Sequence, residues 1–213
     1  MTAPIMTYDS LVNDLLTYPD REDAPYIDQV PRLIMLAENR IASEVRGLGY
    51  IRYATAAFAI GTPVYVKPSR WRQTISLQYV NNVNKRATLF PRTLEFCRTY
   101  WPQGISQTRA PKYYADYDYE HFLIAATPDG AYPFELAYHE KPLELSMSNQ
   151  TNWTTQYNPQ VLLYASLMEA AIWRKRWDEA KTFEEQYNRA AQTLVREDQI
   201  RESDRSIKAG EDR

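Results

Sequence analysis

The sequence predicts an α+β protein in which helices from both ends of the chain form a bundle and enclose an inserted, mostly antiparallel β region. Before residue 50 and after residue 158, apolar residues recur at spacings of three and four, the period of helices that bury one face. Between these parts, short runs of β-type residues are separated by Pro, Asn and Asp. We therefore expect a helical domain made of residues 1–50 and 144–200, a β region over residues 51–143, and an extended C-terminal arm over residues 201–213.

The composition excludes several classes of protein. A chain of 213 residues, 44% of them hydrophobic and 24% charged, is long enough to bury a sizeable core and is not disordered. Its net charge of -2 argues against a general DNA-coating role, and its single cysteine cannot form an internal disulfide or a zinc cluster. The first residues lack the features of a secretory signal, and no apolar run approaches the roughly 18 residues of a membrane-spanning helix. We expect synthesis in the cytoplasm and no insertion into a membrane.

The first helix is expected to begin at Asp9 or Ser10, because either side chain can cap a helix N-terminus. It carries an apolar face of leucine and valine residues and ends before Pro19. This predicts one short helix at the start of the helical domain.

A second helix follows over residues 30–45, with Pro31 near its start. Gly47 and Gly49 come directly after this helix and lack the third glycine of a dinucleotide-binding fingerprint, which must also follow a strand. We therefore interpret the two glycines as part of a helix C-cap.

The β region contains six short runs that read as strands. Turn residues between them predict two hairpins, one at Asn81-Asn82 and one at Asp129-Gly130 between residues 121–126 and 134–138. A short helix over residues 93–100 interrupts the region. The expected strands are Tyr53–Ile60, Pro63–Val66, Gln73–Val80, Arg86–Phe90, Tyr119–Ala126 and Tyr132–His139.

Helical periodicity resumes at Asn158-Pro159 as either two helices or one long bent helix. Large apolar residues, among them Trp173 and Trp177, recur at nearly seven-residue spacing and predict one stripe that buries against the helix over residues 30–45. After residue 195 the apolar period is lost, and we expect an arm that does not fold on its own. The predicted helical core includes Leu33, Ile34, Ile41, Trp173, Trp177 and Tyr187.

Few residues could support catalysis or bind a metal. Only His121 and His139 are present as histidines, and in a strand each would point away from its neighbouring glutamate. Asp116, Asp118 and Glu120 alternate on one predicted strand face, but a solvated strand or an interface explains them better than a calcium site. We predict no enzyme activity, no metal and no cofactor.

Aromatic residues are abundant, with 17 tyrosines and five tryptophans. Such side chains are enriched where proteins meet proteins, although a tyrosine-rich sheet surface is an equal alternative. The predicted tail or subunit interface consists of Tyr113, Tyr114, Tyr117 and Tyr119.

Two short patches combine cations with tryptophan, namely residues 70–72 and 174–177. This combination can grip single-stranded nucleic acid, so a nucleic-acid-binding accessory protein is an alternative function. The second patch lies within a helix, where its cations are expected either to form the solvated face or to pair with Glu169 and Asp178 on neighbouring turns. An enzyme with either histidine as its base is a third, weaker alternative.

Three motifs resemble the head-to-tail adaptor proteins of short-tailed bacteriophages, also described as connector or tail-tube A proteins. The first two lie on the N-terminal helices, and the third starts the long Leu- and Ala-rich C-terminal helix. They are Tyr8-x-Ser10-Leu11-Val12, Val30-Pro31-x-Leu33-Ile34-x-Leu36-Ala37-Glu38-x-Arg40-Ile41 and Tyr157-Asn158-Pro159.

The resemblance implies a structural virion protein at the head-tail junction that forms a ring, typically of twelve copies. Its partners would be the portal protein, a tail nozzle or tail-tube protein, and DNA that passes through the channel without sequence-specific binding. The C-terminal arm would reach the portal, with Ile207 as its apolar anchor. The charged and apolar residues assigned to this portal-binding arm are Arg201, Arg205, Ile207, Lys208 and Arg213.

Overall fold

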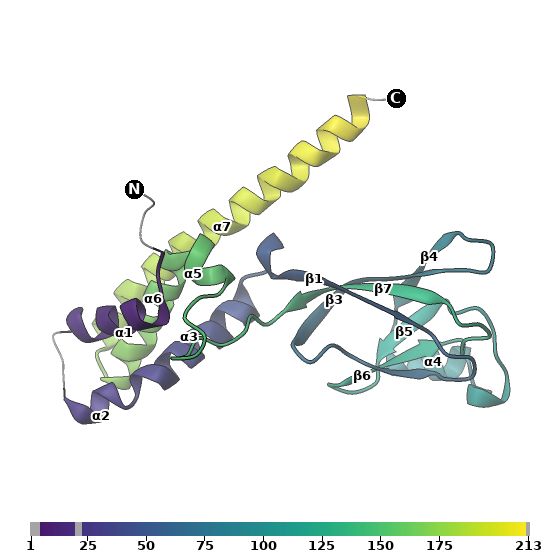
Figure 1. The fold of residues 1–213 in the computed structure, drawn as a ribbon, viewed down its shortest axis with the longest axis horizontal. Coiled ribbons are helices and arrows are strands. Elements are labelled where there is room, and N and C mark those ends of the chain that lie inside the picture. The colour runs from purple at the N-terminus through teal and green to yellow at the C-terminus, as the bar shows by residue number, and fades with distance from the viewer. Residues whose placement is uncertain (1–4, 20–22, 212–213) are drawn as a thin grey trace. The chain divides into compact units, whose positions relative to one another are not determined.

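The computed structural model describes residues 5–19 and 23–211, and these fall into two units (Figure 1). The helical unit combines Met1–Tyr50 with Lys141–Arg213, and the β unit is Ile51–Glu140. The predicted α+β class is confirmed, because segments from both ends of the chain form helices and the middle of the chain forms a seven-stranded, mostly antiparallel sheet.

Helix α1 (Tyr8–Thr17) starts at a cap that differs from the predicted one. Thr7 is the N-cap: its hydroxyl accepts the Ser10 N–H at 3.1 Å, and the Ser10 hydroxyl accepts the Thr7 N–H at 2.9 Å. Ser10 is therefore the third helical residue of a capping box, which satisfies two backbone donors at once. The expectation of a cap at Asp9 or Ser10 was wrong by two to three residues.

Helix α2 (Ala24–Ile27) is a single turn, and helix α3 (Val30–Glu44) has Pro31 in its first turn as predicted. The end of α3 corrects the glycine interpretation. Its C-cap is Val45 in an extended conformation (φ -100°), so no glycine caps the helix. Gly49 is needed for close approach instead, because an added Cβ would lie 1.8 Å from the Trp153 ring.

Three helices complete the unit: α5 (Trp153–Tyr157), α6 (Pro159–Trp173) and α7 (Trp177–Glu211). Helix α6 is buried along most of its length and packs against both α3 and α7. Its small and aliphatic side chains allow this close packing on two sides. The buried side chains of the helical core include Leu11, Leu15, Tyr26, Leu33, Ile34, Ala37, Ile41, Leu162, Ala165, Leu167, Ala170, Tyr187 and Leu194.

The break between α6 and α7 settles the two-helix alternative and overturns one core assignment. Lys175 adopts a left-handed conformation (φ 60°), which ends α6 and restarts the chain in a new helical phase. A seven-residue spacing counted across this break therefore does not stay on one face. Trp173 is 38% exposed and Trp177 is 65% exposed, so neither belongs to the buried core.

The chain continues as helix where an arm without regular structure was expected. Helix α7 runs to Glu211 without interruption. Glu, Arg and Lys are good helix formers, and a helix that is polar all round can be supported by charged pairs four residues apart, so the loss of apolar period did not end the helix. Arg213 lies outside the described residues.

The β unit is built on one sheet with the order β1-β7-β3-β4-β5-β6-β2. All neighbouring pairs are antiparallel except β4 with β5. The core on one sheet face is rich in aromatic and leucine side chains, including Phe58, Leu77, Tyr79, Tyr114 and Phe122. The strands are β1 (Ile51–Ala57), β2 (Val64–Val66), β3 (Trp71–Val80), β4 (Arg86–Pro91), β5 (Tyr113–Asp116), β6 (His121–Ala125) and β7 (Pro133–Glu140).

One predicted hairpin is present and the other is not. Strands β3 and β4 pair across the Asn81 turn, where the Asn81 side chain accepts the N–H groups of Val83 and Lys85. Strands β6 and β7 are not neighbours, so the Asp129-Gly130 hairpin was wrong. The reason is tertiary: β7 occupies the position between β1 and β3, where both of its edges are paired.

Strand β5 was not anticipated as a separate strand, whereas the short helix was. Helix α4 (Leu94–Tyr100) is confirmed, with the Thr93 hydroxyl accepting the Phe96 N–H at 3.2 Å. It packs on β5 and β6 through a small cluster that includes Cys97, Ala115 and Ala125.

We predict that Trp177→Ala changes the free energy of unfolding by less than about 0.5 kcal/mol, because most of the side chain is already in solvent. Leu162→Ala, at a fully buried position of α6, should cost about 2 to 5 kcal/mol. Urea titration of both variants measures the difference. A loss for Trp177→Ala that approaches that of Leu162→Ala would contradict the assignment.

Candidate functional site: the base of the long C-terminal helix

Helix α7 is held at its middle by one buried carboxylate. Asp198 is only 6% exposed, and its Oδ2 accepts the backbone N–H of Leu48 at 2.7 Å. Gly47 lies directly beside it, since an added Cβ would be 2.8 Å from the same oxygen. Leu194, one turn earlier, is buried in the helical core. The segment that leaves α3 is therefore clamped against α7 at this point.

A second set of contacts joins α3, α6 and α7. The Tyr187 hydroxyl donates to Glu44 Oε2 at 2.8 Å, and burial together with this carboxylate raises the pKa of Tyr187. Arg40 donates to Glu169 at 2.7 Å and reaches Glu44 at 3.4 Å. Because Glu169 is largely buried, the Arg40 pair is better shielded from water than an exposed ion pair.

Aromatic side chains line the same part of the unit. Tyr50 meets Trp153 edge-on with ring centroids 4.7 Å apart, and Trp153 stacks on Tyr157 at 5.7 Å. The Tyr50 hydroxyl shares a 3.0 Å hydrogen bond with Thr154, and burial raises the pKa of Tyr50 to about 12. These contacts hold α5 against the end of the first helical segment.

A buried glutamate fastens the chain where it returns from the β unit. Glu38 of α3 accepts the Leu145 N–H at 3.1 Å and the Asn152 side-chain amide at 2.8 Å. Asn152 also caps α5. Removal from water outweighs these hydrogen bonds and raises the pKa of Glu38 to about 7.

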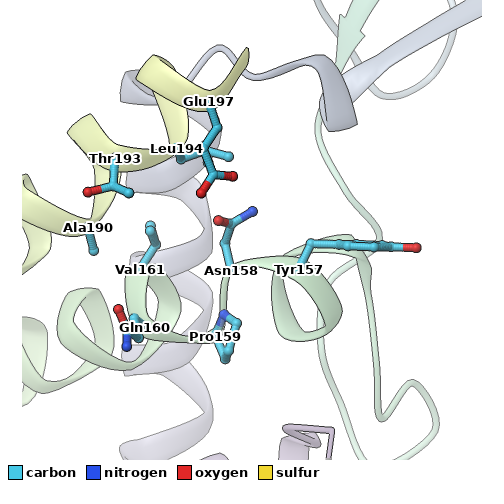
Figure 2. A pocket seen from close by; sticks show the side chains of 9 residues that line it. All are labelled: Tyr157, Asn158, Pro159, Gln160, Val161, Ala190, Thr193, Leu194 and Glu197. Carbon is cyan, nitrogen blue, oxygen red and sulfur yellow. The ribbon is translucent and has the colours of Figure 1, made fainter. Parts of the chain in front are cut away.

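Two open grooves flank α7 near this base. The first, of about 330 Å³, separates α7 from the start of α6, and Figure 2 shows Asn158 and Glu197 directed toward each other across it. Tyr157 points away from α7 in the same view and is 67% exposed. The second groove, of about 400 Å³, lies on the α3 side and includes Val45 and Val195. Neither groove is lined by a histidine or cysteine.

The residues assigned to the portal-binding arm lie on the distal part of α7 or beyond it. Arg201 is exposed and approaches Asp198 Oδ1 at 3.7 Å. Arg205, Ile207 and Lys208 are on the helix, but their side chains are outside the described structure, as is Arg213 altogether.

The predicted tyrosine interface does not form a single surface. Tyr117 and Tyr119 are exposed at 42% and 73%, and Tyr113 is half-buried. Tyr114 is 6% exposed and belongs to the core of the β unit, so its assignment to an interface was wrong. The cause is strand alternation: Tyr113 and Tyr114 are neighbours on β5 and point to opposite faces.

The three alternating carboxylates are not on one strand face either. Asp116 ends β5 and pairs with Lys67 Nζ at 2.8 Å, whereas Asp118 lies in a turn and accepts the N–H groups of Glu120 and His121. A hydrogen bond from the His121 ring at 2.9 Å contributes most to lowering the pKa of Asp118.

Lys67 is a buried cation that the sequence did not predict, and it contacts the ring of Trp71. Its side chain is 2% exposed, and its Nζ lies 3.9 Å from the Trp71 ring centroid and donates to the Asp118 carbonyl. A buried ammonium group needs such compensation. The Trp71 ring therefore packs against Lys67. The neighbouring Arg70 forms an ion pair with Glu140 at 2.8 Å.

In the second cation and tryptophan patch, Arg174 is paired within the helical unit, whereas Lys175, Arg176 and Trp177 are exposed. Arg174 pairs with Glu179 at 2.7 Å, not with the expected Glu169, which pairs with Arg40. Across the described residues, no group of His, Cys, Asp or Glu is arranged to hold a metal ion. His139 lies on β7, and β7 and β6 are not adjacent, so the two histidines do not form a joint site.

The comparison that decides the family covers nearly the whole chain. A family model described as SU10 adaptor protein matches residues 6–209. The chain belongs to the SU10 adaptor protein family. It is thus a bacteriophage structural protein of the head-tail adaptor type, and this family is not known for enzymatic activity. The match includes both units and most of α7.

Two further findings accompany this membership. A search among curated proteins returned no match. In the described parts of the chain, none of the adaptor's helices is long and apolar enough to span a membrane.

We predict that Glu38 makes the adaptor less stable as the pH rises. Because the folded pKa is raised from 4.5 to about 7, the folded state favours the protonated carboxyl, and this contribution is complete below about pH 4.5 and lost by about pH 7. Glu38→Gln keeps a neutral acceptor for Leu145. The stability of wild type relative to Glu38→Gln should therefore fall by on the order of 2 to 3 kcal/mol over this window. Chemical unfolding of both proteins at a series of pH values measures the difference, and a pH-independent difference would show that burial does not control this carboxyl.

Proposed function

We propose that this adaptor forms a ring, of twelve copies as in the connectors that it resembles, between the portal and the tail of a short-tailed phage. Packaged DNA passes through the ring without sequence-specific contacts. Membership of the adaptor family over residues 6–209 supports the proposal, because the match includes the helical unit, the β unit and α7 together. The protein is made in the host cytoplasm and acts at the head-tail junction of the virion.

The length of α7 beyond Asp198 is the feature that supports a contact with the portal. The helix is clamped at Asp198, and beyond this point it continues to Glu211 past the other helices of its unit (Figure 1). After Ile200 the sequence has one large apolar residue, Ile207, among charges of both signs. Such a segment gains little by folding back on its own unit but can bury an apolar anchor in a partner groove. We assign the portal contact to residues 201–213.

The β unit supplies the contact with the tail nozzle or tail-tube protein. Tyr117 and Tyr119 remain available for it, because both are exposed and lie in the turn between β5 and β6. Exposed tyrosines offer a large apolar area with a hydrogen-bonding tip, which suits such an interface. The nucleic-acid-binding alternative has less support, since Trp71 and Arg70 of the first patch have partners within the chain and Arg174 of the second pairs with Glu179, which leaves one short exposed run at residues 175–177.

We predict that deleting residues 201–213 leaves the melting temperature nearly unchanged and abolishes or greatly weakens attachment to portal-bearing heads. The deleted segment begins after the Asp198 clamp, so the helical core keeps its contacts. Thermal unfolding measures the first effect. Electron microscopy of tailless heads incubated with the purified protein measures the second.

Point variants distinguish a specific role of Ile207 as the apolar anchor from a general effect of deleting residues 201–213. Ile207→Asp should reduce attachment strongly, whereas Trp177→Ala, which alters an exposed apolar side chain at the other end of α7, should not. Wild-type attachment by the truncated protein would refute the portal assignment. Loss of attachment accompanied by a large fall in melting temperature would also refute it, because the segment would then be part of the folded core.

A further inference from the structure

The outer side of β4, α4 and β5 presents cations stacked on exposed rings. The Arg92 guanidinium carbon lies 5.5 Å from the Tyr113 ring centroid and 5.6 Å from the Phe96 ring centroid. Lys112 Nζ lies 5.3 Å from the Tyr113 ring centroid. These contacts hold both cations against an aromatic surface. We name this surface the basic-aromatic patch and define it as Phe90, Arg92, Phe96, Tyr100, Lys112 and Tyr113.

Sheet register and ring packing place these side chains together. Phe90 and Tyr113 are partners across the parallel β4–β5 pair, so they share a sheet face opposite the buried Leu89 and Tyr114. Tyr113 meets Tyr100 at 4.8 Å and Phe96 at 5.2 Å. Phe90 is 50% exposed and Phe96 is 40% exposed. The patch therefore combines two half-exposed phenylalanines with tyrosines that pack partly on the unit's own small cluster.

The cations of the patch differ from several others in the β unit. Within the described residues, Arg92 and Lys112 form no ion pair. By contrast, Lys67, Arg70 and Arg86 pair with Asp116, Glu140 and Glu135. The sequence over residues 85–112 carries six Lys and Arg against one Glu. Unpaired cations beside exposed aromatic rings are the composition of a protein-binding centre that meets an acidic partner.

The same chain carries a surface of matching chemistry on α1 and α2. Residues 1–28 contain six Asp and Glu against one Arg. Asp14 and Asp28 form no ion pair with any described residue, and burial raises the pKa of Asp14. The exposed apolar side chains nearby are Tyr18 at 58% and Ile27 at 41%.

These four residues lie on two helices that contact each other. Tyr18 follows Asp14 by one helical turn, and the Tyr26 hydroxyl of α2 donates to the Leu15 carbonyl of α1 at 2.8 Å, which joins α2, with Ile27 and Asp28 at its end, to α1. We name this surface the acidic α1–α2 surface and define it as Asp14, Tyr18, Ile27 and Asp28.

We infer that the acidic α1–α2 surface of one copy docks on the basic-aromatic patch of the next copy. Opposite charges would steer the encounter, and the exposed rings and aliphatic side chains would supply apolar burial. Because the two surfaces are different, the contact is heterologous and repeats around an axis, as a ring requires. The inference rests on the proposed ring and names its subunit interface. Nucleic acid is the less suitable occupant, since strong binding needs many phosphate contacts and the patch offers two cations.

Two double variants test the pairing. Variant one, Arg92→Glu with Lys112→Glu, makes the patch acidic; variant two, Asp14→Lys with Asp28→Lys, makes the α1–α2 surface basic. Each alone opposes like charges at every interface, so self-association of the full chain should weaken roughly tenfold or more. Mixed in equal amounts, the two should associate again, because each interface between unlike copies pairs opposite charges. The matched control, Lys85→Glu with Arg109→Glu, alters two exposed cations outside the patch and should behave as wild type.

Sedimentation of each protein at low ionic strength, where screening is weak, and counts of adaptor-bearing heads by electron microscopy provide the two measurements. Loss in each variant and recovery in the mixture support the inference. Normal assembly of both variants on heads overturns it and leaves the adaptor function intact. Failure of wild type to attach to heads instead counts against the proposed function, and sedimentation still decides the interface. Salt-sensitive DNA binding that only variant one loses, with no recovery in the mixture, assigns the patch to nucleic acid and overturns the inference.

Discussion

The hydrogen bond from the Leu48 N–H to Asp198 is the contact on which the rest of the helical unit depends. It joins the segment that leaves α3 to the middle of α7, although 150 residues separate the two in sequence. Both neighbouring glycines serve this crossing, because a side chain at position 47 would meet Asp198 and one at position 49 would meet Trp153. Helices α3 and α7 are thus joined at this point, and the distal part of α7 has a defined starting point.

Because the β unit is inserted into the helical unit, the chain must return to the helical unit after it, and Glu38 binds the returning segment. The buried carboxylate of α3 holds the returning backbone at Leu145 and the cap of α5 at Asn152. A buried acid is costly, which is why its pKa is raised to about 7. A helical unit that is closed by such contacts keeps its own core, Leu162 and Ala165 included, independent of the inserted sheet.

Some side chains have partners inside the folded chain, and others remain exposed and available to a binding partner. Trp71 covers Lys67, Tyr114 fills the core of the sheet, and Arg174 pairs with Glu179, so none of them is available to a partner. Among the exposed groups of the described residues are the rings and cations beside α4 and the turn tyrosines after β5. These are contact surfaces without reactive chemistry, which suits a structural member of the adaptor family.

Local pattern alone determined the α+β class, the helices around Pro31 and Pro159, the β3–β4 turn at Asn81 and the short helix after Thr93, because period, proline position and capping act within a few residues. Only the tertiary structure decided the rest. The break at Lys175 put Trp177 in solvent, the central place of β7 removed the Asp129-Gly130 hairpin, and the buried Lys67 had no signal in sequence. For the candidate surfaces, the sequence showed that tyrosine is abundant. The meeting of Arg92 and Lys112 on Tyr113 was not predicted, because strand pairing and the packing of α4 bring these side chains together across 20 residues of chain.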